Sequence, residues 1–146
     1  MGVNAHAGLS MLSDLRQIDL PRYVADNGEL VVMESLAHVP FQIARIFTVR
    51  APLEAVRGRH AHRRCSQFLA CVSGAVEVEC NDGHGIRRFM LDRPGKALLV
   101  PPAIWATEIY HQEDSLLVVL CDRGYEPDDY IRDYAEFKAY RTAGVA

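Results

Sequence analysis

The feature that most constrains the fold of this chain is a succession of short apolar segments separated by turn residues. Segments with strand character lie at 29–34, 41–49, 67–72, 75–80, 86–91, 97–100, 104–110 and 115–121. Turn signals such as Asp26-Asn27-Gly28 and Asp92-Arg93-Pro94-Gly95 stand between them. Short strands at close spacing with such turns are typical of an antiparallel sandwich or barrel, so the sequence predicts an all-β fold.

The C-terminal segment departs from the strand pattern. Residues 128–140 carry Tyr130, Tyr134 and Phe137 at helical spacing, and Pro127 with two aspartates suits a helix start. The sequence therefore predicts one amphipathic helix that packs on the barrel, with its tyrosines as packing residues.

Length and composition indicate one globular domain. The chain has 146 residues, of which 49% are hydrophobic and 24% charged, enough to bury a core. Residues 1–15 show no convincing period and are expected to form a loosely ordered tail, which leaves residues 16–146 as a single domain. The net charge of −3 argues against nucleic-acid binding, which usually shows a concentrated basic surface.

Cysteine spacing and hydropathy indicate the cellular compartment in which the protein is expected. The four cysteines have neither CxxC spacing nor the rhythm of a zinc ribbon, so buried reduced thiols are expected. The chain does not begin with the basic region and apolar run of a signal peptide, and no apolar stretch approaches the length of a membrane span. The sequence predicts a cytoplasmic protein without a membrane partner.

A histidine pair marks the stretch with the most chemical information. His60 and His62 lie two residues apart, so on a strand they share one face. Two neighbouring imidazoles suit either a metal site or proton transfer between adjacent atoms of a substrate. The basic residues around them, from Arg57 to Arg64, suit a small anionic ligand. Arg45 lies among apolar residues of an earlier strand and becomes a site residue if that face lines a cavity.

The spacing around the histidines resembles the two sequence motifs of cupins. In the first motif, Gln67 follows the His-x-His after four residues, and Gly74 follows Gln67 after six; in the second, Gly95, Pro101 and Ala106 stand in register. Gln67 replaces the cupin glutamate and Ala106 replaces the second-motif histidine, so two of the four usual metal ligands are missing. Divalent cations need those charges and donors, so neither a bound metal nor another cofactor is expected. Proton transfer is the remaining role for the histidines.

Four stretches together resemble the sugar-nucleotide 3,4-ketoisomerases, the WxcM-like cupins that include FdtA and QdtA. They are the run from Arg57 to Arg63, Pro40 to Arg45, Pro102 to Trp105, and Tyr125 to Tyr140. The resemblance implies a double-stranded β-helix jelly-roll barrel with one C-terminal amphipathic helix. It also implies metal-free conversion of dTDP-4-keto-6-deoxy-D-glucose to a dTDP-3-keto-6-deoxyhexose, through an enediol, in deoxysugar biosynthesis.

The resemblance further implies roles for individual residues. His60 and His62 are the expected catalytic pair, with His60 acting on the carbon-bound proton and His62 at oxygen. The expected substrate contacts are Arg45, Arg57, Gln67, Phe47, Asn27, Trp105 and Ala106. The two arginines suit the pyrophosphate, and Gln67 suits a hydroxyl or a histidine.

Three of these positions depart from relatives. Phe47 stands where many relatives carry a tyrosine, so an auxiliary acid is missing. Asn27 and Ala106 lie in the region that governs which face of carbon 4 is protonated, and Ala106 offers room but no donor. The gluco configuration is the prediction for the product, although these residues do not decide it.

Three alternatives stay open. A 3- or 3,5-epimerase-like cupin acts on similar sugar nucleotides, but such enzymes pair one histidine with a tyrosine and lack the doublet. A metal-dependent cupin would hold stoichiometric metal, and a non-catalytic sugar-binding cupin would bind the nucleotide without turnover. The resemblance also implies a homodimer with exchanged N-terminal strands, for which the 29–34 segment is the candidate.

Overall fold

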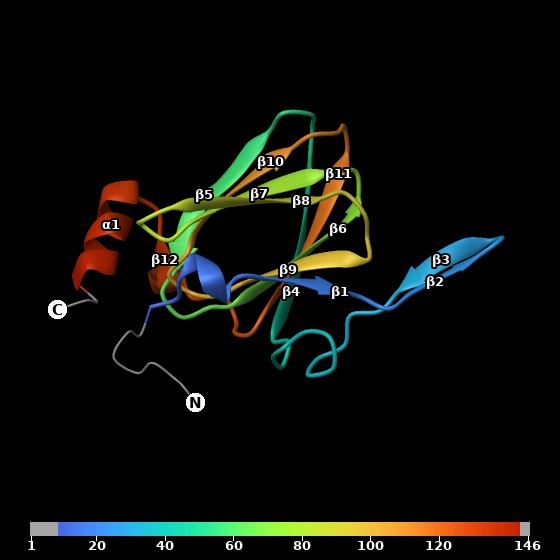
Figure 1. The fold of residues 1–146 in the computed structure, drawn as a ribbon, viewed down its shortest axis with the longest axis horizontal. Coiled ribbons are helices and arrows are strands. Elements are labelled where there is room, and N and C mark those ends of the chain that lie inside the picture. Colours follow the sequence, from blue (N-terminus) through green and yellow to red (C-terminus); the bar gives the residue numbers. More distant parts are fainter. Residues whose placement is uncertain (1–8, 144–146) are drawn as a thin grey trace.

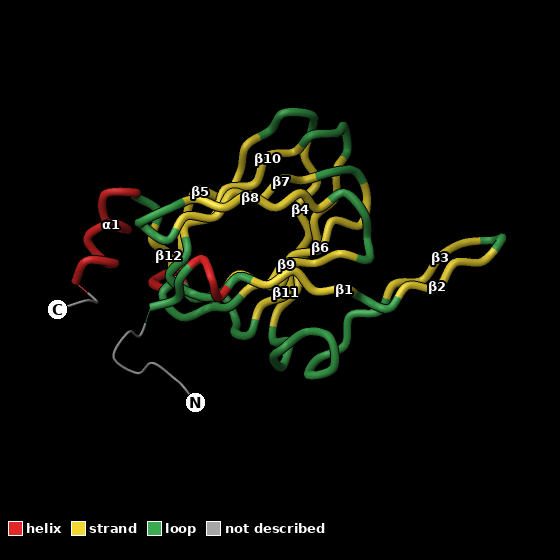
Figure 2. Tube along the Cα trace, in the orientation of Figure 1, coloured by secondary structure: helices red, strands yellow, loops and turns green. Residues whose placement is uncertain are grey.

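The computed structural model describes residues 9–143, which form two five-stranded antiparallel sheets (Figure 1). The first sheet has the order β1 (Arg16–Asp19), β9 (Lys96–Val100), β6 (Gln67–Ser73), β11 (Ser115–Cys121) and β4 (Arg45–Ala51). The second has the order β12 (Tyr130–Ile131), β5 (Val56–His62), β10 (Trp105–Tyr110), β7 (Val76–Asn81) and β8 (Ile86–Leu91). A separate hairpin pairs β2 (Arg22–Ala25) with β3 (Gly28–Val31), and the helix α1 (Tyr134–Ala143) ends the described chain. This arrangement confirms the all-β barrel with one C-terminal α-helix (Figure 2).

Strand β7 shows how alternation in the sequence builds the barrel wall. Val76, Val78 and Cys80 point inward and are fully buried, while Glu79 points outward and pairs with Arg88 of β8 at 2.8 Å. Each buried apolar side chain contributes about 1.5–3 kcal/mol, whereas an exposed ion pair contributes about 0–1 kcal/mol. Burial therefore decides which face of β7 turns inward.

A second apolar cluster lies on the outer side of the first sheet. Phe68 and Leu120 are buried there together with Val39, and Phe41 and Ile43 pack against them. The strand predicted at 41–49 consequently begins later, at Arg45, because the residues before it cover this outer cluster. The start of that predicted strand was wrong.

Gly74 forms the turn between β6 and β7. Its φ of +86° is favoured only by glycine, and a Cβ atom there would lie 2.8 Å from Ser115 Cα. The close approach of β11 therefore explains the glycine of the first cupin motif.

The N-terminal residues 9–15 pack on the barrel, in contrast to the expected loose tail. The short 3₁₀ helix Leu12–Asp14 is anchored because the Leu12 N–H donates to Asp82 Oδ2 at 3.0 Å. Arg141 of α1 donates to the Ser10 carbonyl at 2.6 Å, and Leu15 is only 4% exposed. The remainder of the predicted tail, residues 1–8, lies outside the described residues.

The C-terminal helix begins six residues later than the helical spacing predicts. Pro127–Asp129 form a 3₁₀ turn, and Tyr130–Ile131 then pair with β5 as the edge strand β12. The helix starts only after Asp133, whose carboxylate accepts the N–H of Glu136 at 2.9 Å. This correction places Tyr130 directly opposite His62 instead of on the helix.

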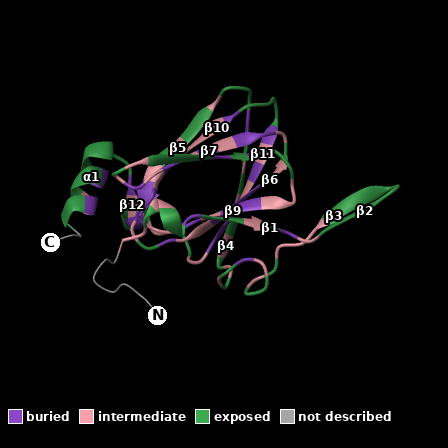
Figure 3. Cartoon of the chain, viewed as in Figure 1, coloured by how far each residue is buried: buried purple, intermediate pink, exposed green. Residues whose placement is uncertain are grey.

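The β2–β3 hairpin projects away from the barrel, on the side opposite to α1 (Figure 1). Its residues are almost all exposed (Figure 3), including Val24 at 70% and Leu30 at 55%. The Asp26-Asn27-Gly28 turn signal joins its two strands. Among residues 9–143, no helix combines the length and apolar character that crossing a bilayer requires.

Candidate active site

A cavity of about 210 Å³ lies inside the barrel, between the two sheets. Its polar lining comes from several elements and includes Arg45, Arg57, His60, Gln67, Glu108 and Tyr130. Phe47 and other apolar side chains of β4, β6 and β11 complete the wall. Arginines beside neutral imidazole and amide groups suit an anionic, hydroxyl-rich ligand.

The two histidines lie together at the end of β5. Their ring centroids are 5.1 Å apart in an edge-to-face arrangement, with His60 lining the cavity and His62 only 7% exposed behind it. Burial and the neighbouring His62 lower the pKa of His60 to about 4. His60 is therefore neutral at pH 7 and able to accept a proton.

A β-bulge sets the direction of His60. The pairing of β5 with β10 shifts between Ala106, opposite His60, and Thr107, opposite Gly58. Arg59 is the extra residue, with a φ of +59°, and Gly58 has a φ of +80°. The glycine permits this bulge immediately before the histidine pair.

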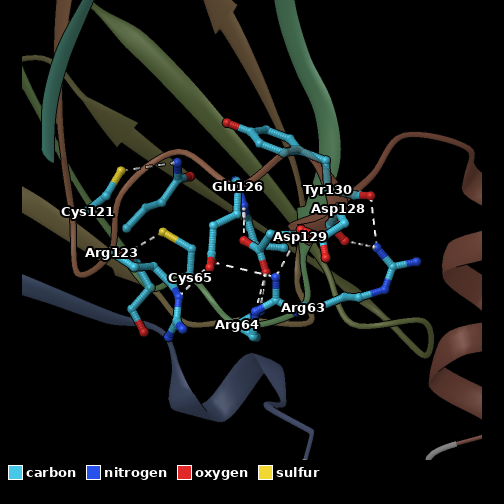
Figure 4. A network of polar contacts seen from close by, with 12 residues as sticks. Arg63, Arg64, Cys65, Cys121, Arg123, Glu126, Asp128, Asp129 and Tyr130 are labelled. Atoms are coloured by element: carbon cyan, nitrogen blue, oxygen red, sulfur yellow. Dashed lines mark hydrogen bonds and ion pairs between the residues drawn. The ribbon is translucent and has the colours of Figure 1, made fainter. Parts of the chain in front are cut away.

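Asp129 fixes the position of His62 through a hydrogen bond. It belongs to a polar network that joins the end of β5 to β12 (Figure 4). Its carboxylate lies 2.8 Å from His62 Nδ1 and also accepts the Arg64 N–H at 2.6 Å. Burial raises the pKa of Asp129, but the hydrogen bonds from His62 and Arg64 outweigh it, so the pKa lies below its ordinary value. The ionised carboxylate keeps the proton on Nδ1 and leaves Nε2 of His62 as an acceptor.

Tyr130 is a site residue that the sequence interpretation missed. Its ring lies 5.2 Å from that of His60 and 4.4 Å from that of His62, and it lines the cavity. Burial lowers the pKa of Arg45, but a hydrogen bond to the Tyr130 hydroxyl outweighs it, so the pKa is raised. The Tyr130 ring therefore lies beside both histidines, and its hydroxyl interacts with Arg45. The signal for it was its place in the stretch from Tyr125 to Tyr140, which resembles the family.

The predicted site residues fall into two groups. Arg45, Phe47, Arg57 and Gln67 line the same cavity as His60, and His62 and Ala106 lie directly beside His60. Asn27 and Trp105 do not line this cavity. Asn27 is in the hairpin turn, and Trp105 packs against Tyr134 and Phe137 of the helix at ring distances of 5.3 and 5.6 Å.

The residues around the histidines fit a cupin metal poorly. Gln67 offers an amide that already contacts Cys121 Sγ at 3.8 Å, and Ala106 offers no ligand atom. Among residues 9–143, one group of three potential ligands clusters within 4.8 Å, namely His62, Cys65 and Asp129. Its His62–Asp129 contact of 2.8 Å is a hydrogen bond, and Cys65 and Asp129 do not stand at cupin ligand positions.

The sequence matches a known family over nearly its whole length. The family model described as "FdtA: WxcM-like, C-terminal" matches residues 13–142. The chain belongs to this family. Within the FdtA family, TDP-4-oxo-6-deoxy-alpha-D-glucose-3,4-oxoisomerase of Aneurinibacillus thermoaerophilus is 35% identical over 124 residues, 84% of this chain and 89% of that protein.

Solved structures of FdtA-like proteins share the fold. A 3,4-ketoisomerase from Helicobacter canadensis superposes with a TM-score of 0.85 at 29% identity, covering 88% of this chain and 98% of that one. QdtA from Thermoanaerobacterium thermosaccharolyticum, in complex with TDP, gives 0.86 at 25% identity, with 91% and 98% covered. This family member is accordingly an enzyme of the sugar 3,4-ketoisomerase class.

Proposed function

We propose that the enzyme converts dTDP-4-keto-6-deoxy-D-glucose to a dTDP-3-keto-6-deoxyhexose by moving protons within the bound sugar. The observation that carries the proposal is His60 facing a cavity lined by arginines, with His62 fixed behind it by Asp129. The named activity of the Aneurinibacillus relative supports the substrate, and the TDP in the QdtA structure supports the nucleotide.

In this reaction carbons 3 and 4 of the same sugar exchange their oxidation states. Carbon 3 loses a hydrogen and becomes the ketone, carbon 4 gains one and becomes the alcohol, and no outside oxidant is needed. His60, which its lowered pKa keeps neutral, takes the proton from carbon 3 while the oxygen on carbon 4 is protonated, giving the enediol. The hydroxyl proton on the carbon 3 oxygen then leaves, and a proton is delivered to carbon 4.

We assign the oxygen-bound protons to His62 and Tyr130. The two rings are 4.4 Å apart, and Tyr130 lines the cavity while His62 keeps Nε2 free of partners among the described residues. Tyr130 thereby supplies the hydroxyl acid that Phe47 lacks. The absence of a metal and of any other cofactor stays a prediction, supported by the ligand chemistry of Gln67 and Ala106.

The arginines support binding of the pyrophosphate. Arg45 and Arg57 line the cavity from two different sheets, and guanidinium groups bind phosphate oxygens in pairs. Arg45 also lies 4.8 Å from the Phe47 ring, which holds the guanidinium against the wall.

We propose the gluco configuration at carbon 4 of the product. This outcome requires the new proton to arrive on the ring face opposite to the one that lost the carbon 3 proton, so two proton-transfer groups are needed. Besides the oxygen-bound proton assigned to it above, Tyr130 from β12 is the second proton-bearing group that lines the cavity with His60 from β5, which supports the presence of two proton-transfer groups. With Ala106 opposite His60, no donor comes from that position on β10.

The proposed function is tested by incubating the purified, chelator-treated protein with dTDP-4-keto-6-deoxy-D-glucose and recording NMR spectra. We expect the carbon 4 ketone to be replaced by a carbon 3 ketone, with a large coupling between the hydrogens on carbons 4 and 5. A small coupling would indicate the galacto product and overturn only the stereochemical proposal. A substrate that stays unchanged, or activity that needs added metal, would contradict the proposed function.

A homodimer with exchanged hairpins is the proposed assembly. The exposed apolar side chains Tyr23, Val24 and Leu30 on the projecting hairpin support it, because such surfaces usually contact a partner. Light scattering should give twice the monomer mass for the wild type and the monomer mass for a variant without residues 22–31. If the wild type and the variant had the same oligomeric state, the exchange would be contradicted.

The cytoplasmic location stays a prediction.

A further inference from the structure

Glu108 is a carboxyl group inside the cavity that the proton transfers described above do not use. It lies on β10 opposite Arg57 of β5 and lines the same cavity as His60. Leu69 and Leu117 belong to the apolar part of the same lining. Among the described residues, no hydrogen bond or ion pair engages the Glu108 carboxyl, although it retains some exposed surface toward the cavity.

The backbone is shaped to accommodate this carboxyl. A Cβ atom at Gly58 would lie 2.6 Å from Glu108 Oε1 and 3.0 Å from the Ala106 carbonyl oxygen. Glu108 therefore occupies the space that the missing side chain of Gly58 leaves open, two residues before His60. Any larger residue at position 58 would push the carboxyl from its place beside the catalytic strand.

The charge of Glu108 depends on pH near neutrality. Burial raises its pKa to about 7, and Arg57 partly opposes this effect. The other charged or titratable groups that line the cavity are Arg45, His60, Tyr110, Tyr130 and Arg132. His60 is neutral above its pKa of about 4, and burial raises the pKa of Tyr110, so neither gains or loses charge near pH 7.

We propose that protonated Glu108 donates a hydrogen bond to an oxygen of the sugar in the cavity and thereby positions the ring against His60. The inference rests on the proposed function. A neutral carboxyl is a donor, whereas a carboxylate can only accept. A carboxylate would also repel the electron-rich enediol, so the protonated form is the one that suits the reaction.

The test compares the pH dependence of kcat/KM for the wild type, Glu108→Gln and the control Glu79→Gln. Glutamine keeps a donor but cannot ionise. We expect wild-type kcat/KM to fall about tenfold per pH unit above about pH 7, and the fall to be absent in Glu108→Gln. The control should follow the wild type, because Glu79 lies on the outer face of β7 with Arg88. A Glu108→Gln profile that falls like the wild type, or a folded variant inactive at every pH, would overturn the inference.

A second measurement needs no variant. Carbon-13 NMR of glutamate-labelled wild type should show one carboxyl that titrates near pH 7, and its pKa should rise when unreactive dTDP-glucose is bound. An unchanged or lower pKa would contradict the inference, whether or not the enzyme turns over. A wild type without isomerase activity would instead refute the proposed function, so the two failures are distinguishable.

Discussion

His60→Asn is expected to lower kcat for isomerisation by about 10³–10⁴-fold, because asparagine has similar polarity but no basic nitrogen. The affinity for dTDP should stay close to that of the wild type, since the arginines of the cavity remain in place. Isomerisation is followed by NMR of the sugar, and dTDP binding by calorimetry. Loss of turnover with binding kept assigns His60 to the chemical step.

The matched control for this variant is His111→Asn. His111 is an exposed histidine whose Nε2 lies 2.8 Å from Glu77 Oε1, on the outer surface. It should retain wild-type turnover. His60→Asn with turnover close to that of the wild type would show that another group removes the carbon-bound proton.

Asp129→Asn is expected to lower kcat/KM by about 10²–10⁴-fold, through His62. The asparagine amide can donate where the carboxylate accepts, which favours the opposite His62 tautomer and places the proton on Nε2. The variant also removes the charge that raises the pKa of His62 against the effect of burial. Initial rates across pH, together with the thermal midpoint, measure the effect.

The neighbouring Asp128→Asn is the control for Asp129. The Asp128 side chain is 84% exposed and pairs with Arg64 at 3.3 Å, so its loss should change kcat/KM by less than about twofold. If both variants lost activity equally, or Asp129→Asn kept the wild-type rate, the orienting role of Asp129 would be refuted. A similar thermal midpoint in both variants would separate this role from a loss of folding.

The strands could be predicted because their signals are local. In β7 the alternation of Val76, Glu77 and Val78 shows directly which face is buried, and the Gly74 turn precedes it. The same holds for the hairpin turn at Asp26-Asn27-Gly28, although the partner strand β2 was not predicted. Fold class and the buried face of short strands follow from such patterns.

The residue at which the C-terminal helix begins could not be predicted, because the contacts that determine it are remote in sequence. Tyr130 has helical spacing with Tyr134 and Phe137, but its pairing with His62 outweighs that local preference. The contact between His62 and Asp129 spans 67 residues. Periodicity carries no information about such a pairing.

The site was predictable only where its members are close in sequence or belong to the family motif. The histidine doublet and Arg57 met both conditions, and they face or adjoin the cavity. Tyr130 lies in the stretch that resembles the family, but its helical spacing assigned it to a helix. Glu108 met neither condition, since it is one acidic residue among many in the chain. Their place in the site depends on how β12 and β10 flank β5.

The most direct test of the central claim is the reaction carried out in deuterium oxide and followed by proton and carbon NMR. Proton transfer between carbons 3 and 4 predicts a carbon 3 ketone, a hydrogen or deuterium on carbon 4, and no exchange at carbon 5. The His60→Asn variant should show none of these changes. A sugar that keeps its carbon 4 ketone and gains deuterium at carbon 3 or carbon 5 would contradict the account, because that outcome is epimerisation.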